Sequence, residues 1–284
     1  MCVTCGCSDE GETKITNLEI SEAEHNHQHT HSHTLADGTV ITHSHSHDTH
    51  TEPSQVHAKI HGTTISLEQD ILAKNNLIAA QNRGWFKGRN ILALNLMSSP
   101  GAGKTTLLTR TINDLKHQVS ISVIEGDQET TNDAKKIQET GCKVIQINTG
   151  TGCHLDASMI DRGLQQLNPP LNSVVMIENV GNLVCPALFD LGELSKVVIL
   201  SVTEGEDKPI KYPHMFRASD IMILTKIDLL PYVQFDVQKC IEYAKQINPK
   251  MQIFQVSATT GVGLDNWYKW LTEKITNMSA VITA

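Results

Sequence analysis

The 284-residue chain carries a formal net charge of −8, and 39% of its residues are hydrophobic. Residues 1–64 hold nine acidic side chains against two lysines, so most of the negative charge lies there. Without a basic surface the chain is not expected to bind nucleic acid, and without an apolar run of about 18 residues it is not expected to insert into a membrane. Seven cysteines, an odd number, and an N-terminus without a secretory signal pattern predict a cytoplasmic protein.

The first 64 residues predict a disordered metal-binding arm, because they are polar and contain no aromatic side chain. The arm opens with MCVTCGC, which places three thiols close to the N-terminal amine. Thiolates with an amine nitrogen favour square-planar Ni²⁺ or Cu, although a tetrahedral Zn²⁺ site accepts the same donors. Exposed thiols without a function are the alternative. The candidate ligands are Cys2, Cys5 and Cys7.

A histidine-rich tract follows, and eleven of the fourteen histidines lie in residues 25–61. In HNHQHTHSH and HSHSHDTH most imidazoles recur on alternate residues, and a flexible segment can fold neighbouring rings onto one ion. The composition predicts accessory metal sites, with an inert low-complexity linker or an expression tag as the alternatives. The accessory candidates are His25, His27, His29, His31, His33, His43, His45, His47 and His50.

Residues 65–284 predict a single α/β domain. An amphipathic helix is expected over 66–83, with Ser66 and Gln69 as its capping box. Apolar runs then alternate with helical patterns, which is typical of a parallel sheet buried on both faces. The expected strands are 90–97, 119–125, 143–148, 172–178, 196–202, 220–226 and 251–257, and the expected helices are 103–116, 131–139, 154–166, 234–247 and 263–276. This order predicts a doubly wound, mostly parallel sheet with helices on both faces.

A phosphate-binding loop is predicted directly after the first of these strands, in SSPGAGKT. Glycines let backbone amides turn towards phosphate oxygens, the lysine neutralises the β- and γ-phosphates, and the threonine hydroxyl binds Mg²⁺. Ser98 replaces the first glycine of the usual pattern, and an ordinary tight turn is the alternative. The candidate residues are Ser99, Gly101, Ala102, Gly103, Lys104, Thr105 and Thr106.

Two further motifs favour guanine over adenine. TKID resembles the NKxD motif of GTPases, with Thr225 in place of asparagine. In that motif the carboxylate, here Asp228, accepts both N–H groups of guanine, and the stem of the lysine, here Lys226, packs along the base. VSATTGVG places Ser257 and Ala258 where a backbone amide of GTPases meets the guanine oxygen.

The residues that would respond to the γ-phosphate lie at two other predicted strand ends. IENVGN matches the DxxG pattern with Glu178 for aspartate, so its carboxylate is a candidate for Mg²⁺ and the Gly181 amide for the γ-phosphate. Asp127, in EGDQET, is the candidate for orienting the attacking water or holding Mg²⁺. A helix-capping or loop carboxylate is the alternative for Asp127. The catalytic candidates are Lys104, Asp127 and Glu178.

A second metal site is predicted beside this nucleotide site. Cys153 and His154 in TGTGCHLDA follow the third predicted strand, and Cys185 lies seven residues beyond Glu178. Two thiols and one imidazole form an incomplete ligand set that a two-fold partner could complete. The set accepts Ni²⁺ or Zn²⁺. A packing role is the alternative, and we expect such a role for Cys142 and Cys240.

Together, SSPGAGKTTLL, EGDQETTNDA, TGTGCHLDA, ENVGNLVCP and TKIDLLP resemble the HypB family of nickel-incorporation GTPases, which belongs to the SIMIBI class of P-loop proteins. The resemblance implies a homodimer, promoted by GTP, that delivers Ni²⁺ to the large subunit of [NiFe]-hydrogenase alongside a HypA-type accessory protein. It also implies metal sites at the residues that match the family motifs, which are Cys2, Cys5, Cys7, Cys153, His154 and Cys185.

Two other functions fit parts of the sequence. A protein that mainly stores and buffers nickel or zinc would use the arm and would need the nucleotide domain only for regulation. A P-loop kinase acting on a small molecule would prefer adenine, which TKID disfavours. The GTPase hypothesis predicts slow hydrolysis, because no arginine finger is assignable.

Overall fold

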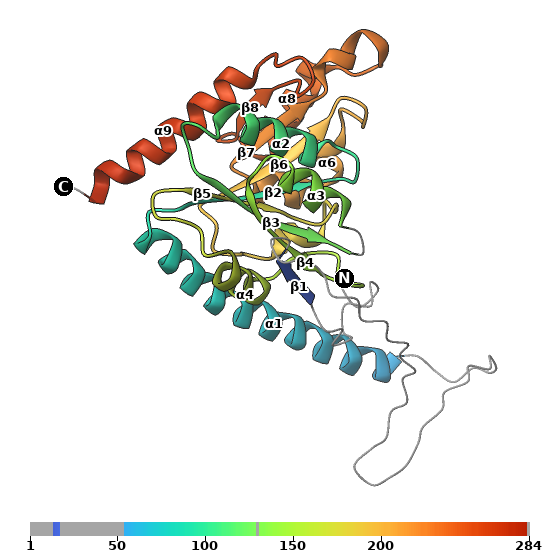
Figure 1. The fold of residues 1–284 in the computed structure, drawn as a ribbon. Helices are drawn as coiled ribbons and strands as arrows, with labels where there is room; N and C mark the ends of the chain where they lie inside the picture. The colour runs from blue at the N-terminus through green and yellow to red at the C-terminus, as the bar shows by residue number, and fades with distance from the viewer. Residues whose placement is uncertain (1–13, 18–53, 129–130, 283–284) are drawn as a thin grey trace. The chain divides into compact units, whose positions relative to one another are not determined.

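The computed structural model of the chain describes residues 14–17, 54–128 and 131–282, and for 14–17, 54–68 and 279–282 it describes the backbone alone. This part forms an eight-stranded sheet in the order β1-β4-β3-β5-β2-β6-β7-β8 (Figure 1). Strands β2 to β8 run parallel, and β1 pairs antiparallel with β4. The strands are β1 (Lys14–Asn17), β2 (Leu92–Ser98), β3 (Ile121–Asp127), β4 (Lys143–Asn148), β5 (Val174–Glu178), β6 (Ser195–Ser201), β7 (Ile221–Thr225) and β8 (Gln252–Gln255).

The helices alternate with these strands, which confirms the predicted α/β architecture. They are α1 (Ser54–Gly88), α2 (Lys104–Leu115), α3 (Asn132–Gln138), α4 (Ala157–Leu167), α5 (Cys185–Leu188), α6 (Lys208–Lys211), α7 (Pro213–Ala218), α8 (Val237–Ile247), α9 (Leu264–Ile282) and the 3-10 helix η2 (Ile227–Tyr232). The short helices α5, α6, α7 and η2 lie where the apolar pattern predicts no element. None of the helices in the described ranges is long and apolar enough to cross a lipid bilayer.

Helices pack on both faces of the sheet because successive strand residues point to opposite sides. On β2, Leu94 belongs to the cluster under α2, α3 and α9. Ala93 belongs to the cluster with α4 and the end of α1, and Met97 to the cluster with α7 and α8. The doubly wound arrangement that the buried strands predict is therefore present.

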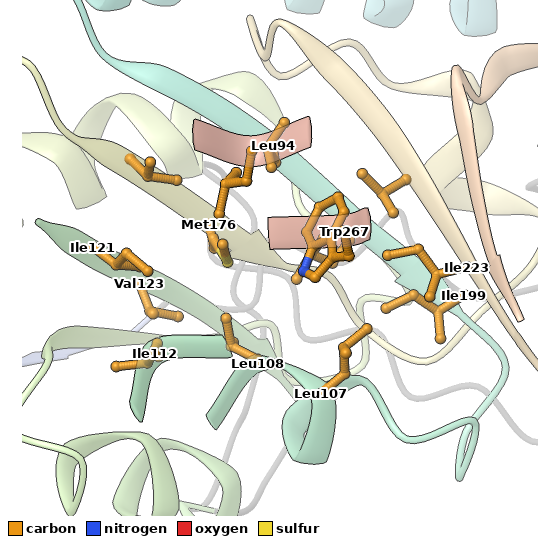
Figure 2. Close-up of a cluster of buried hydrophobic side chains, with 14 of the residues drawn as sticks. Leu94, Leu107, Leu108, Ile112, Ile121, Val123, Met176, Ile199, Ile223 and Trp267 are labelled. Atoms are coloured by element: carbon orange, nitrogen blue, oxygen red, sulfur yellow. The ribbon is translucent and has the colours of Figure 1, made fainter. Parts of the chain in front are cut away.

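One of these clusters fixes the helix that follows the phosphate loop. Figure 2 shows Trp267 of α9 near Leu94, Ile199 and Ile223, with Leu107 on the adjoining α2. The Trp267 indole N–H also donates to the Thr111 hydroxyl at 3.2 Å. Each fully buried aliphatic side chain contributes about 1.5–3 kcal/mol to folding. Their packing holds α2, and with it the phosphate loop, against the sheet.

The N-terminal part differs from the sequence-based expectation in two places. Helix α1 begins at Ser54, so Ser66 and Gln69 lie inside it and the predicted capping box is wrong. Residues 14–17 form β1, although no regular structure is expected in residues 1–64. Extending a packed helix costs less than nucleating one, and the edge of β4 offers unpaired backbone groups to β1. Residues 1–13 and 18–53 lie outside the described part.

Candidate functional site

The predicted nucleotide-binding residues lie at the end of the sheet where the carboxyl ends of the parallel strands meet. Ser98 ends β2, Asp127 ends β3, Glu178 ends β5 and Thr225 ends β7. Strand β5 pairs with β2 on one side and with β3 on the other. The structure therefore brings Glu178 between the strand that carries the phosphate loop and the strand that carries Asp127.

The predicted phosphate loop connects β2 with α2. Gly101 and Gly103 have φ angles of 75° and 94°, a left-handed conformation that side chains disfavour. The Lys104 ammonium donates a 2.8 Å hydrogen bond to the Ser98 hydroxyl. Burial lowers the pKa of Lys104, against the attraction of the Glu178 carboxylate. The serine that replaces the first glycine thus holds the lysine at the loop. Ser99 and Ala102 lie in this loop, and Thr105 and Thr106 lie in the first turn of α2.

The segment after β5 contacts the phosphate loop at two points. The Thr105 hydroxyl donates a 2.7 Å hydrogen bond to Glu178 Oε1. Glu178 is buried, and its Oε2 has no hydrogen-bond partner among the described residues. Burial raises the pKa of Glu178 to about 6. Gly181 packs so closely that an added Cβ would lie 3.0 Å from Pro100 Cγ. Gly181 therefore lies directly against the phosphate loop.

Asp127 lies at the end of β3, and its Oδ1 accepts a 2.8 Å hydrogen bond from the Gln128 amide. Helix α3 begins after Thr131, so Asp127 is not its N-cap. Of the two alternatives to a catalytic role, only a loop carboxylate remains compatible with this geometry.

Glu125 is a residue of this site that the sequence analysis does not single out. It pairs in register with Glu178 on the neighbouring strand, is buried, and has an Oε2 atom without a hydrogen-bond partner within the described ranges. Burial, followed by the charges of Glu178 and Asp127, raises the pKa of Glu125 to about 9. An acidic residue ending an apolar run, two positions before a candidate ligand, was the available signal.

The predicted guanine-recognition residues lie next to the phosphate loop. The buried Thr225 hydroxyl donates a 2.7 Å hydrogen bond to the Ala102 carbonyl. Lys226 has a φ of 59°, and its ammonium donates to the Gly101 carbonyl at 2.8 Å. The lysine stem therefore lies across the loop, and Asp228 lies beyond it in η2.

The loop after β8 is closed by its own backbone. The Ser257 amide donates to the Val262 carbonyl, and the Ser257 hydroxyl accepts from the Thr260 amide. Because the Ser257 amide is engaged, Ala258 is the better candidate for donating an amide to a base. Arg110 of α2 donates to the Ala258 carbonyl at 3.1 Å, which ties this loop to the phosphate-loop helix.

The second predicted site also comes together. Cys153 and His154 lie between β4 and α4, and Cys185 is the first residue of α5. One ligand atom from each lies within 4.8 Å of the other two. Helix α4 begins at Ala157, so the expected start at residue 154 is wrong, and Asp156 caps the helix instead. Both Cys153 and His154 thus belong to the loop.

The His154 ring is held in place by Phe189, which follows the short helix α5 that begins with Cys185. It stacks on Phe189, with ring centroids 3.8 Å apart and an interplanar angle of 26°. Burial lowers the pKa of His154, which favours the neutral imidazole that binds metals. Two thiols and a neutral imidazole are donors that Ni²⁺ and Zn²⁺ both accept.

Two other thiols have no such setting. Cys142 donates to the Ile121 carbonyl, and Cys240 is buried in the cluster with α8. The packing role expected for both agrees with these positions. The remaining predicted ligands lie outside the described residues, namely Cys2, Cys5, Cys7 and the nine histidines of the arm.

Residues 92–255 match the family described as CobW/HypB/UreG, nucleotide-binding domain. The chain is 59% identical to the hydrogenase maturation factor HypB of Rhizobium leguminosarum bv. viciae, over 73% of this chain and 69% of that protein. It is 50% identical to the factor of the same name from Escherichia coli K12, over 95% of this chain and 98% of that protein. The crystal structure of HypB from Helicobacter pylori in complex with nickel is 37% identical, with a TM-score of 0.67 over 72% of this chain and 96% of that one.

Proposed function

Because the chain belongs to the CobW/HypB/UreG family, and within it to the HypB proteins, we propose that it hydrolyses GTP to deliver Ni²⁺ during maturation of [NiFe]-hydrogenase. One observation carries this proposal, namely that residues 178–185 border both sites. Glu178 accepts a hydrogen bond from Thr105 of the phosphate-loop helix, and Cys185 contributes a thiol to the metal-ligand group. A segment that responds to the nucleotide therefore moves a nickel ligand, and the resulting coupling is reciprocal.

The phosphate side of the site fits Mg²⁺. Hydroxyl and carboxylate oxygens are its preferred ligands, and the buried Glu178 Oε2 lacks a partner among the described residues, while Thr105 lies beside it. Asp127 is the third candidate ligand, or it orients the attacking water. When bound, Mg²⁺ would neutralise charge on the β- and γ-phosphates. Lys104 would exchange its Ser98 bond for a phosphate oxygen, and the Gly181 amide would bind the γ-phosphate.

The base side of the site supports GTP rather than ATP. The Asp228 carboxylate would accept both guanine N–H groups, the Lys226 stem would pack along the base, and the Ala258 amide would donate to the guanine oxygen. The phosphate loop is fixed from this side by Thr225. Hydrolysis is expected to be slow, because no arginine is assigned to the transition state.

Nickel is the cargo at Cys153, His154 and Cys185. Three donors leave the coordination incomplete, and a second copy of the chain, associated when GTP is bound, would complete it. Residues 1–64 would supply nickel through Cys2, Cys5 and Cys7, with the histidine tract as a reservoir. In this proposal the partners are a HypA-type accessory protein and the large subunit of [NiFe]-hydrogenase, and Zn²⁺ competes for the same donors.

The test is a nickel titration of the full-length protein in the presence of GDP and of a non-hydrolysable GTP analogue. Wild type should bind nickel with one affinity in the presence of GDP and with a different affinity in the presence of the GTP analogue. Cys185→Ala should have the same nickel affinity with both nucleotides. The arm contributes equally to nickel binding by wild type and by the variant. The difference between the two proteins therefore isolates the contribution of Cys185. Equal affinities in wild type would instead favour the storage function.

A second measurement addresses the need for hydrolysis. Lys104→Ala should lose GTP turnover and should fail to support hydrogenase maturation in cells, because the ammonium that neutralises the phosphates is gone. Normal maturation with this variant would contradict the proposed function.

A further inference from the structure

Asn179 connects segment 178–185 to the loop that carries Cys153 and His154, called here the metal-ligand loop. Its side chain is 1% exposed, and its Oδ1 accepts hydrogen bonds from the amides of Leu155 at 3.1 Å and Val180 at 3.0 Å. Leu155 directly follows His154, and Asn179 directly follows Glu178. The Asn179 side chain, next to Glu178 of the predicted nucleotide site, thus binds the backbone next to His154 of the predicted metal site.

A row of buried amides fixes the orientation of this side chain. Asn179 Nδ2 donates to Asn95 Oδ1 at 3.2 Å, and Asn95 Nδ2 donates to Glu193 Oε1 at 3.1 Å. Asn95 is fully buried on β2, three residues before Ser98. A buried amide that lost these bonds would leave polar groups without partners, at a cost of about 1–3 kcal/mol per group. The Asn179 amide is therefore not free to rotate away from Leu155.

Asn182 forms a second connection within the same segment. Its Nδ2 donates to the Cys153 carbonyl at 3.3 Å, and its Oδ1 accepts from the Val184 amide at 2.8 Å. The first bond reaches one ligand residue, and the second orders the turn before Cys185. Segment 178–185 thus contacts the loop of Cys153 on both sides of His154.

The metal-ligand loop cannot shift independently of these contacts. The Leu155 side chain is fully buried, and a Cβ added to Gly126 would lie 2.8 Å from Leu155 Cγ. Leu155 is therefore confined by the end of β3 and by the amide of Asn179. A displacement of segment 178–185 must either move Cys153 and His154 with it or break buried hydrogen bonds.

We propose that Asn179 and Asn182 are the positioning residues that transmit the nucleotide state to the nickel ligands. The inference rests on the proposed function and names the contacts through which its coupling acts. Neither residue is proposed to bind nickel or nucleotide with its side chain. Each acts by fixing the backbone of the loop that carries Cys153 and His154, relative to the segment that carries Glu178 and Cys185.

The test uses the full-length protein and the ratio of nickel affinities measured with GDP and with a non-hydrolysable GTP analogue. Allosteric ratios are typically about 5–150, and we expect wild type to fall in this range. Asn179→Ala and Asn182→Ala should each lower the ratio towards 1. The number of nickel ions bound per chain should remain that of wild type in both variants, because no ligand is removed. A general loss of stability would shift both affinities together and leave the ratio unchanged.

Asn248→Ala is the matched control. Its side chain donates to the Ser219 and Phe216 carbonyls and accepts from the Lys250 amide, next to β8 at the opposite edge of the sheet. It should keep the wild-type ratio. If Asn179→Ala does not fold, the half-buried Asn182 decides the test. Wild-type ratios in the folded variants would overturn this inference alone, whereas a ratio of 1 in wild type would overturn the proposed coupling as well.

Discussion

Replacing Thr225 by valine tests whether the end of β7 fixes the phosphate loop. The hydroxyl donates to the Ala102 carbonyl at 2.7 Å and to the Leu200 carbonyl at 3.3 Å, and Thr225 and Ala102 are both almost fully buried. Valine has nearly the same shape but no donor. The substitution therefore removes the hydrogen bonds without opening a cavity.

The size of the effect follows from the burial. Leaving a buried acceptor unpaired costs about 1–3 kcal/mol. If the whole cost appears in nucleotide binding, the dissociation constant for GDP rises about 5- to 150-fold. If part of it appears in the nucleotide-free protein, the free energy of unfolding falls by the remainder.

Two measurements separate these contributions for Thr225→Val, namely titration with a fluorescent GDP analogue and denaturant unfolding without nucleotide. Thr225→Ser keeps the hydroxyl and serves as the control, so it should bind GDP almost as wild type does. A valine variant with wild-type affinity and wild-type stability would refute the reasoning. It would mean that the loop is held without this hydroxyl.

Three further predictions concern Gly181, an ion pair and a partly buried thiol. Gly181→Ala should lower GTP turnover about tenfold with little change in GDP affinity, because a Cβ 3.0 Å from Pro100 Cγ displaces the Gly181 amide proposed to bind the γ-phosphate. Wild-type turnover in this variant would argue against that role of the amide. Burial raises the pKa of Asp190, but bonds from Arg83 and the Gly192 amide outweigh it and hold the pKa below its usual value. Because a carboxylate with a lowered pKa stabilises the fold above its unfolded pKa of about 3.9, Arg83→Ala should cost roughly 0.5–1 kcal/mol at pH 7 for this half-exposed pair. The cost should disappear as unfolding is followed below pH 4, and a cost independent of pH would count against the ion pair. Cys142 should resist iodoacetamide at pH 8, as mass spectrometry would show, because burial raises its pKa to about 12; rapid alkylation would mean that the strand edge opens.

The parallel strands were predictable because each is built around apolar residues between turn residues, although polar residues interrupt β4 and begin and end β8. The ends of β2, β5 and β7 follow from these runs, and with them the positions of Ser98, Glu178 and Thr225. Periodicity also located the helices that pack on the sheet. It failed for residues 54–65, whose polar sequence continues a helix that is fixed by packing further along.

The buried polar groups were not predictable in the same way. Glu125 faces Glu178 only because of the register between β3 and β5, and Asn95 reaches Asn179 only because β2 and β5 are neighbours. Strand order and register are set by tertiary packing, and a motif of consecutive residues does not contain them. Sequence motifs therefore identified the groups that would contact ligands, whereas the structure identified the groups that connect them.

The position of β5 explains how the segment after that strand reaches both the phosphate loop and the candidate metal ligands. Strand β5 has β2 on one side and β3 on the other, with β4 next to β3. Its following loop borders the phosphate loop and also the loop after β4 that carries Cys153 and His154. A cysteine–histidine pair grafted after β6 or β7 would lie on the base side of the phosphate loop, away from the γ-phosphate. To place a metal under nucleotide control in another P-loop protein, a designer should accordingly first choose a strand by its neighbours in the sheet. The sequence of the loop after that strand is the second choice.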